Sequence, residues 1–169
     1  MKHIGIVYYS RSGTARLVAQ RLADHLACSA HEVRDARPRI GVTGDLRCLF
    51  DSVFRRSAAL LYDGPSPKAF DHVVIVTPVW LGALSSPIRA FLTRYAQCCR
   101  SYSLVVVMSR QGAERVSREA SKIVRRRPIF LLPLKQINVL AEDFDADLRD
   151  LSRAIEAMKD DGTRLTTPV

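Results

Sequence analysis

The chain has 169 residues, a length that fits one domain with a substantial buried core. Hydrophobic residues make up 47% and charged residues 25%, which is ordinary for a globular protein and excludes a largely disordered chain. Lys and Arg number 26 against 17 Asp and Glu, and the formal charge of +9 favours anionic partners without choosing among them. We expect one domain over residues 1–159 and a flexible polar tail over residues 160–169.

The four cysteines, Cys28, Cys48, Cys98 and Cys99, lack the paired spacing of a metal site, and we interpret them as free thiols of a reducing compartment. The apolar run at 4–9 is too short for a signal peptide. No stretch approaches the roughly 20 apolar residues that a membrane span requires. The expectations are therefore no metal, no membrane insertion and a cytoplasmic location.

The first quarter of the chain predicts a strand, a helix and a second strand. Residues 4–9 form a nearly continuous apolar run, which is typical of a strand buried on both faces. Residues 14–27 place leucine and valine on one stripe of a helix. Residues 31–35 fit a short strand, and a loop is expected over 36–44.

The middle of the chain predicts a helix, a strand and another helix. Apolar residues recur at helical spacing over 46–61, and a Gly-Pro-Ser-Pro segment at 64–67 ends this helix. The clearest strand is the Val-Val-Ile-Val run at 73–76. Ser86 and Pro87 suit the N-cap and first position of the next helix.

Towards the end of the chain, residues 104–108 predict a further buried strand and residues 113–126 a helix. The segments 129–132 and 136–140 compete for the last strand, and Pro133 between them indicates a break or a sheet edge.

A closing helix is indicated by apolar residues from Phe144 to Met158, with Asp143 as its cap. Strands thus alternate with helices, which implies right-handed crossovers and a parallel sheet covered on both faces. The predicted fold class is α/β, three-layered and doubly wound, with no internal repeat and no second domain.

In open α/β sheets the ligand lies beyond the carboxyl ends of the strands, where the strand order reverses. The loop after the first predicted strand, residues 10–15, holds three hydroxyl side chains and one glycine at the start of a helix. Backbone N–H groups and the helix dipole favour an anion there, and a monophosphate fits best. The alternative is a helix capped by Ser12 with no ligand.

Other phosphate-binding motifs are excluded by the same loop. Neither a P-loop nor a dinucleotide-binding glycine pattern occurs. A low-molecular-weight phosphatase would need a cysteine within the loop, and it has none. A response-regulator receiver would need acidic residues at the strand ends, where this chain has Tyr-Tyr-Ser at 8–10 and Thr-Pro at 77–78.

The loop predicted over 77–87 follows the third strand and holds Trp80, the only tryptophan, close to Gly82. A planar aromatic surface beside exposed backbone amides suits a flat heterocycle. The alternative is that Trp80 covers the end of the sheet as ordinary core.

Taken together, the segment YSRSGT at 9–14 and the segment VTPVWLG at 76–82, with Pro87, Phe91 and Leu92, resemble the flavodoxin family over nearly the whole chain. The resemblance implies a five-stranded parallel sheet of order 2-1-3-4-5 that binds flavin mononucleotide (FMN) without a covalent bond.

The resemblance also implies that residues 10–15 surround the 5′-phosphate. The family usually ends this motif with Asn-Thr, whereas this chain has Thr14-Ala15 and so lacks one hydroxyl donor. We expect FMN binding to be weaker by about 1 kcal/mol, with the Ala15 amide retained. The implied phosphate ligands are Ser10, Arg11, Ser12, Gly13, Thr14 and Ala15.

By the same resemblance, residues 78–84 line one side of the flavin ring, with the backbone near Gly82 close to its N5 edge, and residues 109–113 contact the pyrimidine edge. Arg110 either stabilises negative charge on the reduced flavin or is a simple surface arginine. The implied ring contacts are Pro78, Val79, Trp80, Leu81, Gly82, Ala83, Ser109, Arg110, Gln111 and Gly112.

No catalytic set of side chains is recognisable, and the four histidines lie outside these loops, so we predict binding residues and no catalytic ones. That pattern fits a protein whose cofactor performs the redox chemistry. Electron-carrier flavodoxins are generally acidic, so the charge of +9 favours an NAD(P)H-dependent oxidoreductase acting on a quinone or similar acceptor. The alternatives are an electron carrier between redox partner proteins, or a flavin-free sensing or assembly protein.

The run Arg125-Arg126-Arg127 raises a nucleic-acid-binding alternative. It precedes Pro128 at a predicted helix end, where cations interact favourably with the dipole. No nucleic-acid-binding module is recognisable and aromatic residues do not interleave with the basic ones, so we expect no nucleic-acid partner. The sequence leaves homo-oligomerisation open.

Overall fold

The computed structural model describes residues 3–35 and 60–164. Its sheet has the strand order β3-β2-β1-β4-β6-β7. Within the described residues, five of the strands run parallel to one another. Counted along the chain, the parallel strands have the order 2-1-3-4-5, which confirms the predicted topology. They are β1 (Ile4–Tyr8), β2 (Ala30–Asp35), β4 (His72–Trp80), β6 (Tyr102–Met108) and β7 (Leu131–Lys135).

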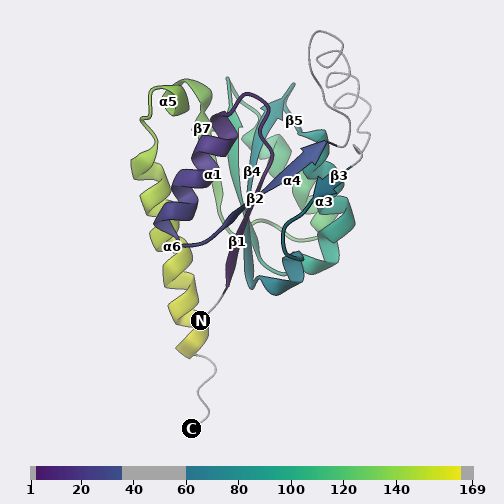
Figure 1. The fold of residues 1–169 in the computed structure, drawn as a ribbon, viewed down its shortest axis with the longest axis vertical. Helices are drawn as coiled ribbons and strands as arrows, with labels where there is room; N and C mark the ends of the chain where they lie inside the picture. The colour runs from purple at the N-terminus through teal and green to yellow at the C-terminus, as the bar shows by residue number, and fades with distance from the viewer. Residues whose placement is uncertain (1–2, 36–59, 165–169) are drawn as a thin grey trace.

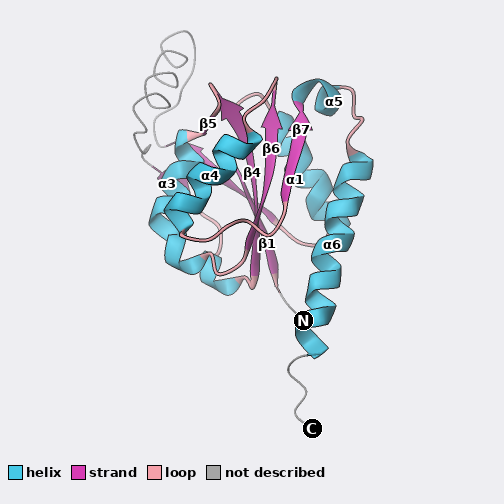
Figure 2. Cartoon of the chain, turned by 180° about the vertical axis from the view of Figure 1, so that it is seen from behind, coloured by secondary structure: helices cyan, strands magenta, loops and turns pink. Residues whose placement is uncertain are grey.

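Helices cover both faces of this sheet (Figure 1). On one side lie α1 (Thr14–His25), α5 (Gln136–Leu140) and α6 (Asp145–Arg164), and on the other lie α3 (Ser86–Tyr95) and α4 (Ala113–Val124). The view from behind shows the same three layers (Figure 2). The three-layer α/β prediction is therefore confirmed.

Alternate residues of the central strands enter two separate cores. Ile6 and Val74 pack towards α1 and α6, whereas Val7 and Ile75 pack towards α3 and α4. All four side chains are fully buried. Burial on both faces requires apolar residues at consecutive positions, which explains the unbroken apolar runs in the sequence. Each such side chain contributes about 1.5–3 kcal/mol to folding.

The prediction of a helix over 46–61 is wrong at the end of that range, where the structure has strand β3 (Leu60–Tyr62). This strand runs antiparallel to β2 at the edge of the sheet. Tyr62 stacks edge-on against Phe91 with a centroid distance of 5.1 Å and donates a hydrogen bond to the Pro65 carbonyl. These tertiary contacts override the helical spacing of the local sequence. The predicted loop at 36–44 and the rest of that helix lie outside the described residues.

The segment predicted as a loop over 77–87 is largely a β-hairpin. Strand β4 continues to Trp80, and β5 (Ala83–Leu84) pairs antiparallel with it. Leu81 and Gly82 have φ values of 50° and 72°, the positive pair required by a tight two-residue turn. Glycine suits that turn at the second position, but leucine at the first is an unusual turn residue, which concealed the hairpin in the sequence.

Several predicted boundaries shift by small steps. The N-cap of α3 is Ser85, so Ser86 and Pro87 occupy its first two positions. Pro133 lies inside β7, where the sheet edge tolerates it, and 136–140 is helical rather than a strand. The helix predicted over 113–126 ends at Val124. Helix α6 reaches Arg164, so the backbone of 160–164, expected in the tail, is helical.

Among the described residues, no helix has the length and apolar content to cross a membrane. The same residues contain no cluster of His, Cys, Asp or Glu suited to holding a metal ion.

The two adjacent cysteines differ in their surroundings, and we expect them to differ in reactivity. Burial raises the pKa of the Cys99 thiol to about 12, whereas Cys98 is half-buried. Because the thiolate is the reactive form, brief treatment with iodoacetamide at about pH 8 is expected to alkylate Cys98 and spare Cys99. Labelling of Cys99 should rise only as the pH approaches that pKa. Tandem mass spectrometry separates the two sites, and equal labelling near neutral pH would contradict the buried position of Cys99.

Candidate functional site

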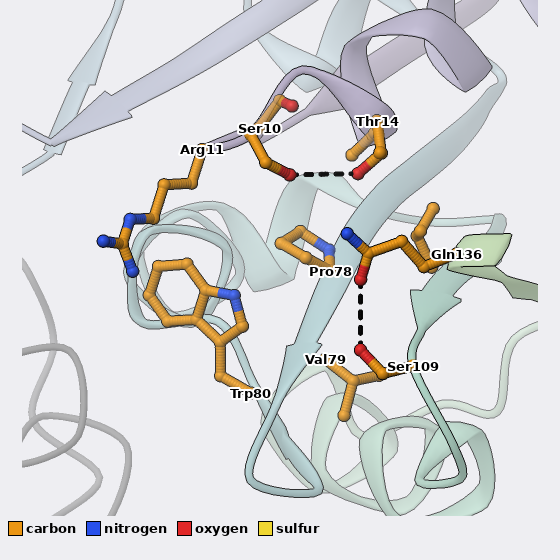
Figure 3. Close-up of a pocket in the computed structure, with 11 residues that line it drawn as sticks. Ser10, Arg11, Thr14, Pro78, Val79, Trp80, Ser109 and Gln136 are labelled. Atoms are coloured by element: carbon orange, nitrogen blue, oxygen red, sulfur yellow. Dashed lines mark hydrogen bonds between the residues drawn. The ribbon is translucent and has the colours of Figure 1, made fainter. Parts of the chain in front are cut away.

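A cavity of about 420 Å³ opens beside the carboxyl ends of β1, β4 and β6 (Figure 3). The cavity lies at the topological switch point of the sheet. The chain passes from β1 to β2 on one side, whereas the next parallel strand, β4, lies on the other side of β1. The residues that line it are Ser10, Arg11, Ser12, Thr14, Ala15, Pro78, Val79, Trp80, Val107, Ser109 and Gln136.

The loop between β1 and α1 gathers hydroxyl and N–H groups on one wall. The Gly13 N–H donates to Ser10 Oγ at 3.1 Å, and the hydroxyls of Ser12 and Thr14 lie 3.2 Å apart. Gly13 is the N-cap of α1 with a φ of 92°, a conformation that favours glycine. A Cβ atom built there would meet no atom within 4 Å, so the backbone conformation and not crowding selects glycine.

The electrostatics of this cavity suit an anion. Among the described residues that line it, Arg11 is the one cation and none is acidic. The first turn of α1 also contains no acidic residue, although helices commonly place one there to complement the dipole. The positive end of the helix is therefore left to a ligand or to solvent.

Trp80 lies at the end of β4 and contributes to the opposite wall. Its ring meets Tyr9 edge-on at a centroid distance of 5.7 Å, and the Arg11 guanidinium carbon lies 5.8 Å from its centroid. Figure 3 shows the Arg11 side chain beside the indole ring. Trp80 is only partly buried, so it is not an ordinary core residue and presents an aromatic surface to the cavity.

The structure divides the predicted ligand contacts between two cavities. Nine of the predicted residues line the first cavity, but Leu81, Gly82 and residues 110–112 line a second cavity of about 670 Å³. Gly13 shapes the first loop without lining the cavity, and Ala83 pairs with Trp80 in the hairpin. The nine are Ser10, Arg11, Ser12, Thr14, Ala15, Pro78, Val79, Trp80 and Ser109.

Gln136 is a cavity residue that the sequence analysis missed. It begins α5, directly after β7, and its side-chain oxygen accepts a hydrogen bond from Ser109 Oγ at 3.0 Å. The sequence prediction covers only the loops after the first, third and fourth parallel strands. The residue after the last parallel strand also lies at the carboxyl edge, and that rule would have found it.

A buried ion pair, also missed, fixes the hairpin behind the site. Glu119 Oε1 accepts from Arg89 Nε at 2.7 Å, and Glu119 Oε2 accepts from the Leu84 N–H at 3.0 Å. Arg89 Nη2 donates in turn to the Leu84 carbonyl at 2.9 Å. The hairpin is thereby joined to both α3 and α4, which positions Val79 and Trp80.

The strand order and the cavity at its switch point define a flavodoxin-like fold. Among solved structures, a flavoprotein in complex with FMN from Lactobacillus acidophilus NCFM is similar, with a TM-score of 0.68 and 15% identity over 84% of this chain and 98% of that one. Flavodoxin bound to FMN from Fusobacterium nucleatum has a TM-score of 0.61 and 12% identity, covering 94% and 99% of the two chains. An NAD(P)H:quinone oxidoreductase from Methanothermobacter marburgensis has a TM-score of 0.56 and 13% identity, covering 92% and 96%.

These TM-scores establish a shared fold. Because the sequence identities are low, the ligand and the activity must be argued from the site. Neither a protein-family model nor a curated protein matches the sequence.

Proposed function

We propose that this chain binds FMN in the first cavity and acts as an NAD(P)H-dependent oxidoreductase that reduces a quinone or similar acceptor. The observation that carries the proposal is the meeting of the hydroxyl-rich loop with Trp80 in one cavity at the switch point of a flavodoxin-like fold. Two similar structures hold FMN, and a third is an NAD(P)H:quinone oxidoreductase. When bound, FMN supplies the capacity to accept a hydride or single electrons.

The residues present fit the two ends of this cofactor. A phosphate suits the loop of Ser10, Ser12 and Thr14, because hydroxyls and the helix start face a cavity without acidic lining. Trp80 offers an aromatic surface to the ring system. Since Gln136 accepts from Ser109 through its oxygen, its amide NH₂ remains available to donate to a ring carbonyl.

The reductase proposal is tested by anaerobic stopped-flow mixing of the FMN-loaded protein with NADH and with NADPH. We expect at least one of them to bleach the flavin absorbance and a soluble quinone to restore it. The basic surface, with a net charge of +9, favours an enzyme over a carrier that docks through acidic groups. Failure of both dinucleotides to bleach the flavin would instead leave the electron-carrier function.

The missing hydroxyl at Ala15 gives a prediction about affinity. Ala15 lines the cavity in the first turn of α1, so Ala15→Ser places a hydroxyl beside the proposed phosphate. One added hydrogen bond is expected to tighten FMN binding about fivefold, or roughly 1 kcal/mol. Fluorescence titration measures the change. Ala23→Ser, on α1 but away from the cavity, is the control and should leave the affinity unchanged. Weaker or equal binding by Ala15→Ser would contradict the placement of the phosphate.

A further inference from the structure

The second cavity lies across the end of the sheet from the first. Met108, which packs with the α3 and α4 core, lines it, whereas Val107 of the opposite core lines the first cavity. The volume of about 670 Å³ lies within the range of small-molecule sites. Its walls are the tip of the hairpin, the loop between β6 and α4, and the first turns of α4.

Three arginines line this cavity against a single carboxylate. Arg110, Arg115 and Arg118 line the cavity together with Glu114, and all four residues are exposed. Within the part of the chain that the structure describes, none of the three guanidinium groups has an ion pair or hydrogen bond. Arg89 on the neighbouring helix differs, because Glu119 neutralises its charge. The cavity therefore has an uncompensated positive charge.

One of these arginines, Arg115, contacts the hairpin tip, which lies between the two cavities. A Cβ atom built on Gly82 would lie 3.3 Å from Arg115 Nη1, so the guanidinium lies against the hairpin tip. A Cβ atom built on Gly112 would lie 2.9 Å from Val79 Cγ1 and 3.2 Å from Gly82 Cα, so the β6–α4 loop also touches the hairpin. A ligand held by the arginines would thus be adjacent to Val79, which lines the proposed flavin site.

We infer that this second cavity binds the diphosphate of the nicotinamide dinucleotide that reduces the flavin; the inference rests on the proposed function. Planar guanidinium groups bind phosphate oxygens through paired hydrogen bonds. A neutral quinone offers carbonyl acceptors but no charge to compensate three cations, whereas a diphosphate carries that charge. The arginines thus assign this cavity to the electron donor and not to the acceptor.

The test is calorimetric titration of the FMN-loaded protein with ADP-ribose, which carries the diphosphate and lacks nicotinamide. We compare the wild type with the double variant Arg115→Ala/Arg118→Ala, and Lys122→Ala is the control because it is exposed on the same helix outside the cavity. Loss of two charge-assisted contacts is expected to weaken ADP-ribose binding at least about tenfold, while the control stays within about twofold.

Two further ligands distinguish the source of the phosphate. Adenosine should bind far more weakly than ADP-ribose, and inorganic pyrophosphate should compete with ADP-ribose. If pyrophosphate binds and ADP-ribose does not, the assignment of the cavity to a dinucleotide is overturned and the cavity is a site for a free anion. Equal affinity of the wild type and the double variant would overturn the site. If Lys122→Ala lost as much affinity for ADP-ribose as the double variant, binding would be due to a diffuse basic surface, such as one for an acidic protein. That result would also overturn the site in the second cavity.

Flavin reduction in the same proteins separates this inference from the proposed function. A KM for the dinucleotide that rises only in the double variant supports both the reductase activity and the second cavity as its donor site. Bleaching with an unchanged KM would preserve the proposed reductase and overturn the second cavity as its donor site. ADP-ribose binding that depends on the arginines, without bleaching by NADH or NADPH, would overturn the reductase and the donor role together.

Discussion

Replacing Glu119 with alanine is expected to lower the free energy of unfolding by about 3 kcal/mol, because the change leaves the Arg89 guanidinium buried without its carboxylate. The side chains of Arg89 and Glu119 are only 5% and 13% exposed, so water cannot replace the lost partner fully. The substitution also removes the acceptor of the Leu84 N–H. The hairpin that presents Trp80 should therefore loosen, and FMN affinity should fall with stability.

Urea denaturation of the wild type and the variant measures this effect. Glu114→Ala is the matched control: it removes an exposed carboxylate from the first turn of the same helix, and loss of its interaction with the helix dipole should lower the unfolding free energy by at most about 1 kcal/mol. Equal effects of the two substitutions would show that the ion pair does not hold the hairpin to α3 and α4.

Ser12→Asp is expected to weaken FMN binding about 100-fold, or roughly 3 kcal/mol, because a carboxylate would then lie where the phosphate is proposed to bind. The same carboxylate lies one residue before the N-cap of α1. There it interacts favourably with the helix dipole, so the FMN-free protein should gain up to about 1 kcal/mol of stability. Affinity and stability are thus predicted to change in opposite directions.

Fluorescence titration and thermal unfolding of the FMN-free protein measure the two changes separately. Ser12→Ala is the control, and the loss of one neutral hydrogen bond should weaken FMN binding only about fivefold. If Ser12→Asp retained the affinity of Ser12→Ala, the phosphate would not lie at this loop.

The layers of the fold were predictable because burial on both faces leaves a strong pattern in the sequence. The runs at 4–9, 73–76 and 104–108 correspond to β1, β4 and β6 at the centre of the sheet. The two short antiparallel strands left no such pattern. β3 depends on contacts between Tyr62 and the distant Phe91, and β5 depends on a turn with Leu81 at positive φ. Local sequence does not record either requirement.

The candidate site was predictable where a single loop forms it. Hydroxyls and glycine before a helix indicate an anion site without further knowledge of the fold, as the loop from Ser10 to Thr14 illustrates. The buried Arg89–Glu119 pair and the second cavity were not predictable, because each depends on segments that only tertiary packing brings together. The division of the predicted ring contacts between two cavities has the same origin.

The basic run at residues 125–127 also became clear only in the structure. Arg125 ends α4 with a φ of 58°, and the Arg126 carbonyl accepts a hydrogen bond from the Tyr102 hydroxyl at 2.9 Å. Arg126 Nη1 donates to the Arg100 carbonyl at 3.4 Å. These contacts join the end of α4 to β6 and to Arg100, and they give the run a structural role that the sequence does not indicate.

Titration of FMN with the purified protein, followed by flavin fluorescence, tests the central claim most directly. If the loop after β1 and the end of β4 hold the cofactor together, fluorescence should be quenched in a saturable manner with one FMN per chain. Fluorescence that stays unquenched, or falls only in proportion to added protein without saturation, would contradict an FMN site in this cavity.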